Sequence, residues 1–214
     1  MYLFQPERFL LEQQIKRRAS SITGSVLDVG AGHVRRYERF FKTTEYIGLD
    51  TEKHELADVV GTADKIPFPD NRFDSIVCTQ VLGDVFDFHA ALDEFRRVLK
   101  PGGTILLTEG FMNELHDEPH DYYRFTKFSF EKLFAMHGFE VLHIDQRGGY
   151  FASRAQLRIR YYIDRFKLYS KKWAIFLRPL FSLYGRLAIA RDTRDTSVAN
   201  RKHALGWCVV ARKK

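Results

Sequence analysis

The sequence is poor in cysteine. Its 214 residues include only Cys78 and Cys208, which lie far apart and have no histidine or further cysteine at metal-ligand spacing. We therefore expect neither a disulfide framework nor a zinc site, and a reducing, cytoplasmic setting. Residues 1–20 contain Glu7 and Glu12 and lack an unbroken apolar segment with a small-residue cleavage site, so we predict no signal peptide.

Long uncharged apolar segments are also lacking. The most apolar segment, Trp173 to Ala190, contains Arg178 and Arg186, and we expect Pro179 and Gly185 to interrupt any helix there. A transmembrane helix needs about 20 mostly uncharged residues, and an arginine at the bilayer centre costs about 2.5–3.5 kcal/mol. We therefore predict no membrane span.

Positive charge is concentrated in one part of the chain. The composition, with 45% hydrophobic and 29% charged residues, is typical of one ordinary globular domain, and the net charge is +7. Residues 147–194 hold 12 Lys or Arg against Asp164 and Asp192, whereas the remainder holds 22 basic and 25 acidic residues. The basic character thus belongs to a single segment, and the rest of the chain gives no reason to expect nucleic-acid binding.

A glycine-containing turn between two apolar runs is the main feature that is present. Val26 to Gly32 (VLDVGAG) predicts a strand followed by a Gly-x-Gly turn, and Tyr46 to Asp50 predicts a second strand that ends in an acid. Gly30 and Gly32 permit a tight turn and let a ligand approach bare main chain. Asp50 is placed to accept hydrogen bonds from ribose hydroxyls. The pattern indicates a nucleotide-type site.

The third glycine of a dinucleotide-binding turn is missing, because His33 and Val34 follow Gly32. Asp28, two residues before Gly30, could meet a cation or fix the turn. A ligand with a positively charged methionine end suits this pattern better than a diphosphate does. A nicotinamide-dependent dehydrogenase is therefore the weaker interpretation.

The motifs between residues 25 and 146 resemble, in order and spacing, the class I S-adenosylmethionine-dependent methyltransferases of the type 11 branch. The resemblance implies a Rossmann-like three-layer α/β sandwich with a seven-stranded, mostly parallel sheet, an antiparallel last strand and a helical insertion before it. The motifs are Leu27 to Gly32, Asp50, Ala63-Asp64 before Ile66-Pro67-Phe68, Phe73-Asp74, and Arg97 to Gly103 (RVLKPGG).

The resemblance also implies S-adenosyl-L-methionine as the cofactor. Relatives carry an acid-histidine pair where Gly83 and Asp84 stand, so we do not assign catalysis to that pair. The residues expected to bind the cofactor are Asp28, Gly30, Ala31, Gly32, Asp50, Ala63, Asp64, Gln80 and Val81.

Hydrophobic periodicity and turn residues predict the remaining elements. We expect helices over 6–20, 35–42, 88–100 and 129–137, the last with Ser129 as its N-cap, and strands over 57–61, 73–79, 104–108, 139–145 and 204–211. The methyltransferase core is predicted to comprise 1–150 and 200–214, and the basic amphipathic helical insertion 151–199.

Titratable and aromatic residues are concentrated in the loop 111–128, after the fifth predicted strand. We predict His120, His116 and Tyr123 as catalytic residues, because a histidine there could take a proton from a hydroxyl that is being methylated. A structural ion pair between Asp121 and Arg124 is the alternative. His116 and His120 are four residues apart, but Pro119 disfavours a helix between them, so no metal is predicted.

The basic, aromatic-rich segment 152–190 admits three interpretations. It could be a helical cap over the substrate pocket or in a dimer, a surface in peripheral contact with an anionic membrane, or an RNA-binding surface, which is the least favoured. The oligomeric state is not readable.

The sequence as a whole predicts an S-adenosylmethionine-dependent methyltransferase. No Asp/Asn-Pro-Pro-Tyr/Phe motif and no Pro-Cys nucleophile is present, so nucleic acid is not the expected acceptor. We predict O-methylation of a small-molecule, glycan or lipid-linked acceptor. The alternatives are a catalytically silent methyltransferase-like scaffold and an RNA methyltransferase. The predicted location is the cytoplasm, with the inner face of the membrane as a peripheral site.

Overall fold

A computed structural model of the chain describes residues 3–214 and divides them into two compact units. The first, which we call the sheet unit, comprises Gln14–Gly110, His116–Asp145 and Trp207–Lys214. The second, the helical unit, comprises 3–13, Phe111–Leu115 and Gln146–Gly206.

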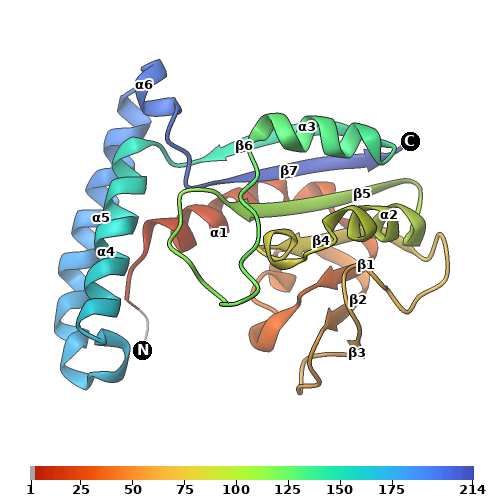
Figure 1. The fold of residues 1–214 in the computed structure, drawn as a ribbon, viewed down its shortest axis with the longest axis horizontal. Coiled ribbons are helices and arrows are strands. Elements are labelled where there is room, and N and C mark those ends of the chain that lie inside the picture. The colour runs from red at the N-terminus through yellow and green to blue at the C-terminus, as the bar shows by residue number, and fades with distance from the viewer. Residues whose placement is uncertain (1–2) are drawn as a thin grey trace. The chain divides into compact units, whose positions relative to one another are not determined.

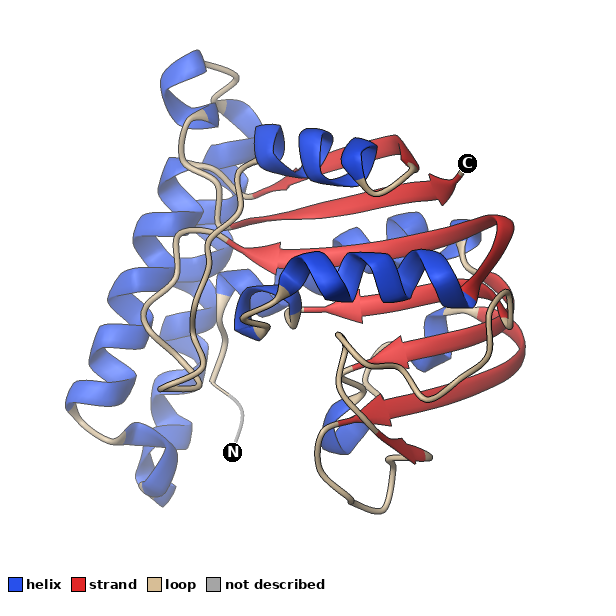
Figure 2. Cartoon of the chain, turned by 45° about the vertical axis from the view of Figure 1, so that its right-hand side comes forward, coloured by secondary structure: helices blue, strands red, loops and turns tan. Residues whose placement is uncertain are grey.

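The sheet unit is built on seven strands in the order β3-β2-β1-β4-β5-β7-β6. β1 pairs in parallel with β2 and β4, and β4 with β5, while β7 is antiparallel (Figure 2). This order confirms the predicted Rossmann-like α/β fold. The strands are β1 Thr23–Val29, β2 Lys42–Asp50, β3 Val59–Val60, β4 Phe73–Thr79, β5 Leu99–Gly110, β6 Phe139–Arg147 and β7 Gly206–Lys213.

Helices cover the sheet on both faces. α2 (Phe88–Val98) and α3 (Lys127–Met136) lie over one face, and the end of α1 (Pro6–Arg18) lies over the other (Figure 1). The amphipathic α2 buries Ala91, Leu92, Phe95 and Val98, which are spaced at three and four residues. The central strands β1 and β4 are buried on both faces, as parallel strands between helices are.

In the sheet unit, two local predictions are wrong. No α-helix forms over 35–42; instead the short 3-10 turns Gly32–Val34 and Glu38–Phe40 precede β2. Arg35 is the reason, because its backbone is left-handed (φ 39°) and its guanidinium donates to the Leu56 carbonyl and to Asp58. At α3 the N-cap is Thr126, and Ser129 is the third helical residue, whose hydroxyl completes a capping box.

The helical unit contains an antiparallel helix pair, α4 (Tyr150–Arg165) and α5 (Arg178–Arg194) (Figure 1). They are joined by the 3-10 segments Leu168–Ser170 and Lys172–Leu177 and followed by α6 (Val198–Arg201). The hydrophobic core of this unit consists of Leu3, Phe4, Ile159, Ile163, Leu168, Ala174 and Phe181.

Gly185 does not interrupt α5, contrary to the prediction. It lies within the helix against the ring of Phe4, whose Cε1 would be 2.5 Å from a Cβ at this position. The N-terminus of α4 is capped from α5, because the Asp192 carboxylate accepts hydrogen bonds from the N–H groups of Gly149, Phe151 and Ala152. Among residues 3–214, no helix combines the length and apolarity that crossing a membrane requires.

Candidate functional site

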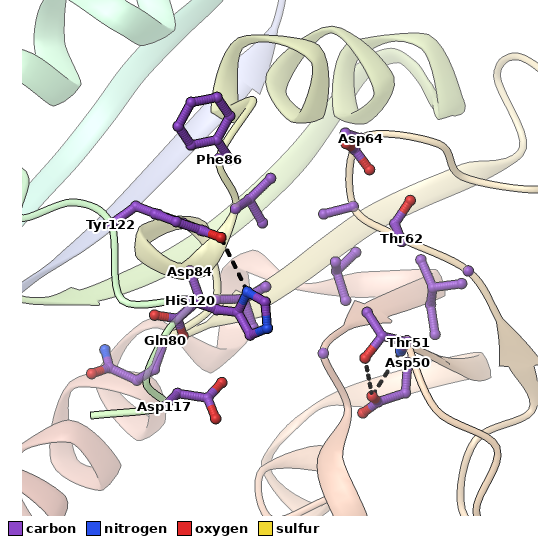
Figure 3. A pocket seen from close by; sticks show the side chains of 17 residues that line it. Asp50, Thr51, Thr62, Asp64, Gln80, Asp84, Phe86, Asp117, His120 and Tyr122 are labelled. Atoms are coloured by element: carbon purple, nitrogen blue, oxygen red, sulfur yellow. Dashed lines mark hydrogen bonds between the residues drawn. The ribbon is translucent and has the colours of Figure 1, made fainter. Parts of the chain in front are cut away.

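A pocket opens in the sheet unit where β1, β2 and β4 end, the edge at which open α/β sheets bind ligands (Figure 3). Its volume is about 520 Å³, in the range of small-molecule sites. Six of the nine predicted cofactor residues line it, namely Gly30, Asp50, Ala63, Asp64, Gln80 and Val81. Asp28, Ala31 and Gly32 lie in the adjoining strand and turn but not on the pocket wall.

The turn after β1 is fixed to the end of β2. The N–H groups of Gly30 and Ala31 both donate to the Leu49 carbonyl, at 2.9 and 3.2 Å. Gly30 has φ 71° and Gly32 has φ 61°, a conformation that side chains disfavour. A Cβ on Gly30 would lie 2.3 Å from Val81 Cγ2, whereas one on Gly32 would meet nothing within 4 Å. Gly30 is therefore required by packing and by backbone conformation, and Gly32 by conformation alone.

Asp50 ends β2 with its carboxylate already partly bonded. Oδ2 accepts from Gly32 N–H at 2.9 Å and Oδ1 from Thr51 N–H at 2.8 Å. His54 Nε2 lies 3.3 Å from Oδ2. Partial burial raises the pKa of Asp50, but the hydrogen bond from Gly32 N–H and the nearby His54 ring outweigh burial and hold that pKa below its usual value. The carboxylate is therefore ionised at neutral pH and faces the pocket as an acceptor of hydrogen bonds.

Asp28 lies behind the turn and is buried. The Tyr46 hydroxyl donates to its Oδ2 at 2.7 Å, while its buried Oδ1 has no hydrogen-bond partner among the described residues. Burial raises the pKa of Asp28 to about 6, although the Tyr46 hydrogen bond acts in the opposite direction. The sequence left two roles open for Asp28, to meet a cation or to fix the turn. Because Asp28 is bonded to Tyr46 and is not part of the pocket wall, the geometry favours a role inside the protein over contact with a ligand.

Gln80 follows β4 in an unusual conformation. Its φ is 59°, left-handed for a residue that is not glycine, and its N–H donates to the Thr108 carbonyl at 2.8 Å. Strained backbone of this kind occurs often at ligand sites. Val81 and Leu82 continue the turn, and both of their N–H groups donate to Glu109 Oε1, at 3.0 and 2.7 Å. The end of β5 thereby fixes the segment that closes one side of the pocket.

Of the three predicted catalytic residues, only His120 lines the pocket. Its Nδ1 lies 3.0 Å from the Tyr122 hydroxyl, and Tyr122 is itself part of the wall (Figure 3). Tyr123 donates its hydroxyl to the Phe86 carbonyl at 3.1 Å and is not a wall residue. His116 is also outside the wall, with Nδ1 3.2 Å from Asp121 and Nε2 3.9 Å from Asp84.

Asp84 lines the pocket, although sequence reasoning set it aside. It lies in the 3-10 turn Leu82–Asp84 directly after β4. Burial raises the pKa of Asp84 to about 6, with the His116 charge acting in the opposite direction. The sequence did contain a signal for this residue, because Asp84 follows the carboxyl end of a predicted central strand, where open α/β sheets bind ligands.

The structure explains why glycine occupies position 83. A Cβ there would lie 3.0 Å from the Tyr123 carbonyl oxygen and 3.2 Å from Glu109 Oε2. The Gly83 carbonyl accepts hydrogen bonds from the N–H groups of Tyr122 and Tyr123, at 3.1 and 3.0 Å. The 121–125 segment therefore packs against the backbone at residue 83, and a side chain there would require these neighbours to shift by a few tenths of an ångström.

Asp84, His116 and Asp121 bring ligand atoms close enough for a metal ion. However, Arg124 donates to both carboxylate oxygens of Asp121. This ion pair lowers the pKa of Asp121 to about 2. The Arg124 guanidinium thus bonds the oxygen atoms that a metal ion would need. Asp121 and Arg124 form the ion pair that the sequence offered as the alternative to a catalytic role for this loop.

Comparison with known proteins agrees with the geometry. Residues 27–107 match the family described as methyltransferase domain, type 11. Residues 27–107 thus carry a class I S-adenosylmethionine-dependent methyltransferase domain, as the motifs predicted, and S-adenosylmethionine is the methyl donor of that family.

Two of the similar proteins are named as methyltransferases, one of ubiquinone and menaquinone biosynthesis and one that methylates sterols. The chain is 44% identical over 84 residues to the ubiquinone/menaquinone biosynthesis C-methyltransferase UbiE of Shewanella frigidimarina, which covers 39% of this chain and 29% of that protein. It is 34% identical over 110 residues to the sterol 24-C-methyltransferase ERG6B of Gibberella zeae, covering 43% and 29%. The chain spans between 24% and 42% of the length of the curated relatives it matches.

The fold is shared with solved structures at low sequence identity. The [4+2]-cyclase SpnF aligns with a TM-score of 0.62 at 19% identity, over 95% of this chain and 80% of that one. This likeness shows the fold alone. The name of that protein also indicates that the fold can serve reactions other than methyl transfer.

Proposed function

We propose that this chain transfers the methyl group of S-adenosylmethionine to a small-molecule acceptor. The observation that carries the proposal is a pocket with two chemically distinct ends. Asp50 lies at one end, and Asp84, His120 and Tyr122 lie at the other (Figure 3). Gly30 is beside Asp50, because its N–H donates to the Leu49 carbonyl.

The residues present fit the cofactor. Asp50 supplies an ionised carboxylate for ribose hydroxyls, and the left-handed Gly30 leaves main chain uncovered beside it. Ala63 and Asp64 would border the adenine, and Gln80 and Val81 the methionine portion. When bound, S-adenosylmethionine supplies an electrophilic methyl carbon on a sulfonium, so the protein contributes mainly by holding the acceptor in line.

The acceptor end offers two groups that can take a proton. We propose His120 as the general base for an acceptor hydroxyl, with Asp84 as the other candidate. The acceptor oxygen loses its proton to the base and forms a bond to the methyl carbon as the carbon–sulfur bond breaks. The sulfonium charge is thereby lost, and S-adenosylhomocysteine leaves as a neutral thioether. His116 and Tyr123 hold the loop rather than touch the acceptor.

Methylation at carbon is the second candidate. UbiE of Shewanella frigidimarina is named a C-methyltransferase, and so is the sterol enzyme. Removing a proton from a phenol also activates its ring carbons, so the same base would serve either outcome. The proposed acceptor is a small molecule, a glycan or a lipid-linked head group. Both cysteines are free and buried, which supports the proposed cytoplasmic setting.

The test is release of S-adenosylhomocysteine in the presence of fractionated cell extract. We expect release with a small-molecule or lipid fraction, and mass spectrometry with a labelled methyl group would locate the atom methylated. Binding of S-adenosylmethionine without release in any fraction would favour a silent scaffold. Release only with the RNA fraction would replace the proposed acceptor with RNA.

A further inference from the structure

We propose that the end of the α4–α5 helix pair, residues 161–187, lies on the surface of an anionic lipid bilayer. We call these residues the hairpin tip. They include the end of α4, both 3-10 segments and the first part of α5. The proposal is independent of methyl transfer and concerns only the helical unit.

The hairpin tip exposes large apolar side chains. Its inward positions, Ile163, Leu168, Ala174 and Phe181, fill the core of the helical unit. Further apolar side chains stand between these positions and face solvent, and among them Phe176 is 79% exposed. Exposed apolar side chains in this density mark an interaction surface. The other exposed residues of this kind are Tyr161, Tyr162, Phe166, Tyr169, Trp173, Ile175, Leu180, Leu183 and Leu187.

Exposed cations surround these apolar side chains. The hairpin tip holds six Lys or Arg and a single acid, Asp164. Lys171 Nζ lies 5.7 Å from the centre of the Trp173 ring, which places a cation beside the most amphipathic side chain of the tip. All six cations are exposed: Arg165, Lys167, Lys171, Lys172, Arg178 and Arg186.

This combination has the chemistry of an anionic membrane interface. Lysine and arginine attract acidic headgroups while apolar and aromatic side chains enter the boundary of the acyl chains. Tryptophan is favoured at that depth because its ring is apolar and its N–H is polar. Since no helix among residues 3–214 can cross a bilayer, the contact would be a surface contact.

Other occupants fit less well. A second copy of the chain would bring two sets of like charges together in a two-fold interface. A nucleic acid would pair with the cations and aromatic rings but would leave aliphatic Ile175, Leu180, Leu183 and Leu187 without a partner. A lipid surface uses both kinds of side chain.

Vesicle flotation tests the proposal directly with the full chain. We expect flotation with vesicles of phosphatidylcholine and phosphatidylglycerol, weaker flotation at high salt, and little with phosphatidylcholine alone. With Lys171 and Lys172 both changed to Glu, binding should fall at least 30-fold, since each lysine near an anionic surface contributes about fivefold. Phe176→Ser should weaken binding about tenfold.

Matched controls lie on α3 of the sheet unit, where Phe128 and Lys132 are also exposed. Phe128→Ser and Lys132→Glu should float like the unaltered chain. Trp173 gives a second readout, because its fluorescence should shift to the blue with anionic vesicles and be quenched by brominated lipid. Trp173→Phe should abolish that change, since Trp207 is only 8% exposed.

The proposal is overturned if the protein stays at the bottom of the gradient with both vesicle types. Equal losses in the tip variants and the α3 variants would also contradict it. Two further results would assign the tip to another partner: a dimer in solution that Phe176→Ser dissociates, or retention of RNA that depends on Lys171 and Lys172 while vesicles are not bound.

Discussion

Replacing Gly30 with alanine should destabilise the protein more than the same change at Gly32, two residues away. Both glycines have left-handed backbone, so both alanine variants incur a conformational cost of about 1–2 kcal/mol. At Gly30 the new Cβ would also lie 2.3 Å from Val81 Cγ2. Overpacking of this kind costs about 1–3 kcal/mol more.

The expected loss in unfolding free energy is therefore about 2–5 kcal/mol for Gly30→Ala and about 1–2 kcal/mol for Gly32→Ala. Urea denaturation followed by circular dichroism measures both on the same protein. Because Val81 lines the pocket, Gly30→Ala should also weaken binding of S-adenosylmethionine more than Gly32→Ala does. Equal losses of stability in the two variants would refute the packing argument and leave backbone conformation as the sole role of both glycines.

Four further substitutions test the pocket and its support. Asp50→Ala should weaken S-adenosylmethionine binding by about 1–3 kcal/mol in calorimetry, because hydrogen bonds to a charged group are lost; unchanged affinity would remove Asp50 from the site. His120→Ala should lower kcat about 10²–10⁴-fold with little change in cofactor affinity, and an unchanged kcat would rule it out as the base. If Asp84 is the base instead, kcat should rise with pH through about 6, as its carboxyl ionises, and Asp84→Asn should lose that rise. Burial raises the pKa of Glu109 to about 8, above its value in the unfolded chain. Its contribution to stability is therefore present at pH 4 and lost as pH rises toward 8. The unfolding free energy of Glu109→Gln, relative to the unaltered chain, should rise between pH 5 and pH 8, and a constant difference would contradict the pKa shift.

Much of the sheet could be predicted from local sequence. The run Phe73 to Thr79 is apolar and bounded by turn residues, and it forms β4 with those limits. The amphipathic helix that begins at Phe88 follows the predicted spacing and ends two residues early, at Val98. Such elements are determined by hydrophobic periodicity, which a single sequence displays.

The helix predicted over 35–42 failed because distant residues decide that segment. Arg35 reaches Leu56 and Asp58, and these contacts hold its backbone left-handed. A local pattern contains no information about partners twenty residues away. The same limit applies to Gly83, where Tyr123 and Glu109 leave little room for a side chain.

Some residues of the candidate site could also be predicted from local sequence, and others could not. Asp50 and Gly30 were predicted to bind the cofactor because the motif and its spacing are local, and they line the pocket. His116 and His120 looked equivalent in sequence, yet only His120 lines the pocket, since the backbone of His116 donates to Asp121. The roles of these residues stay predictions until ligand binding and turnover are measured.

Calorimetric titration of the intact chain with S-adenosylmethionine, and separately with NAD, tests the central claim most directly. The account predicts saturable one-site binding of S-adenosylmethionine that S-adenosylhomocysteine competes away, and no heat of binding with NAD. Binding of NAD alone, or no binding of S-adenosylmethionine by folded protein, would contradict it.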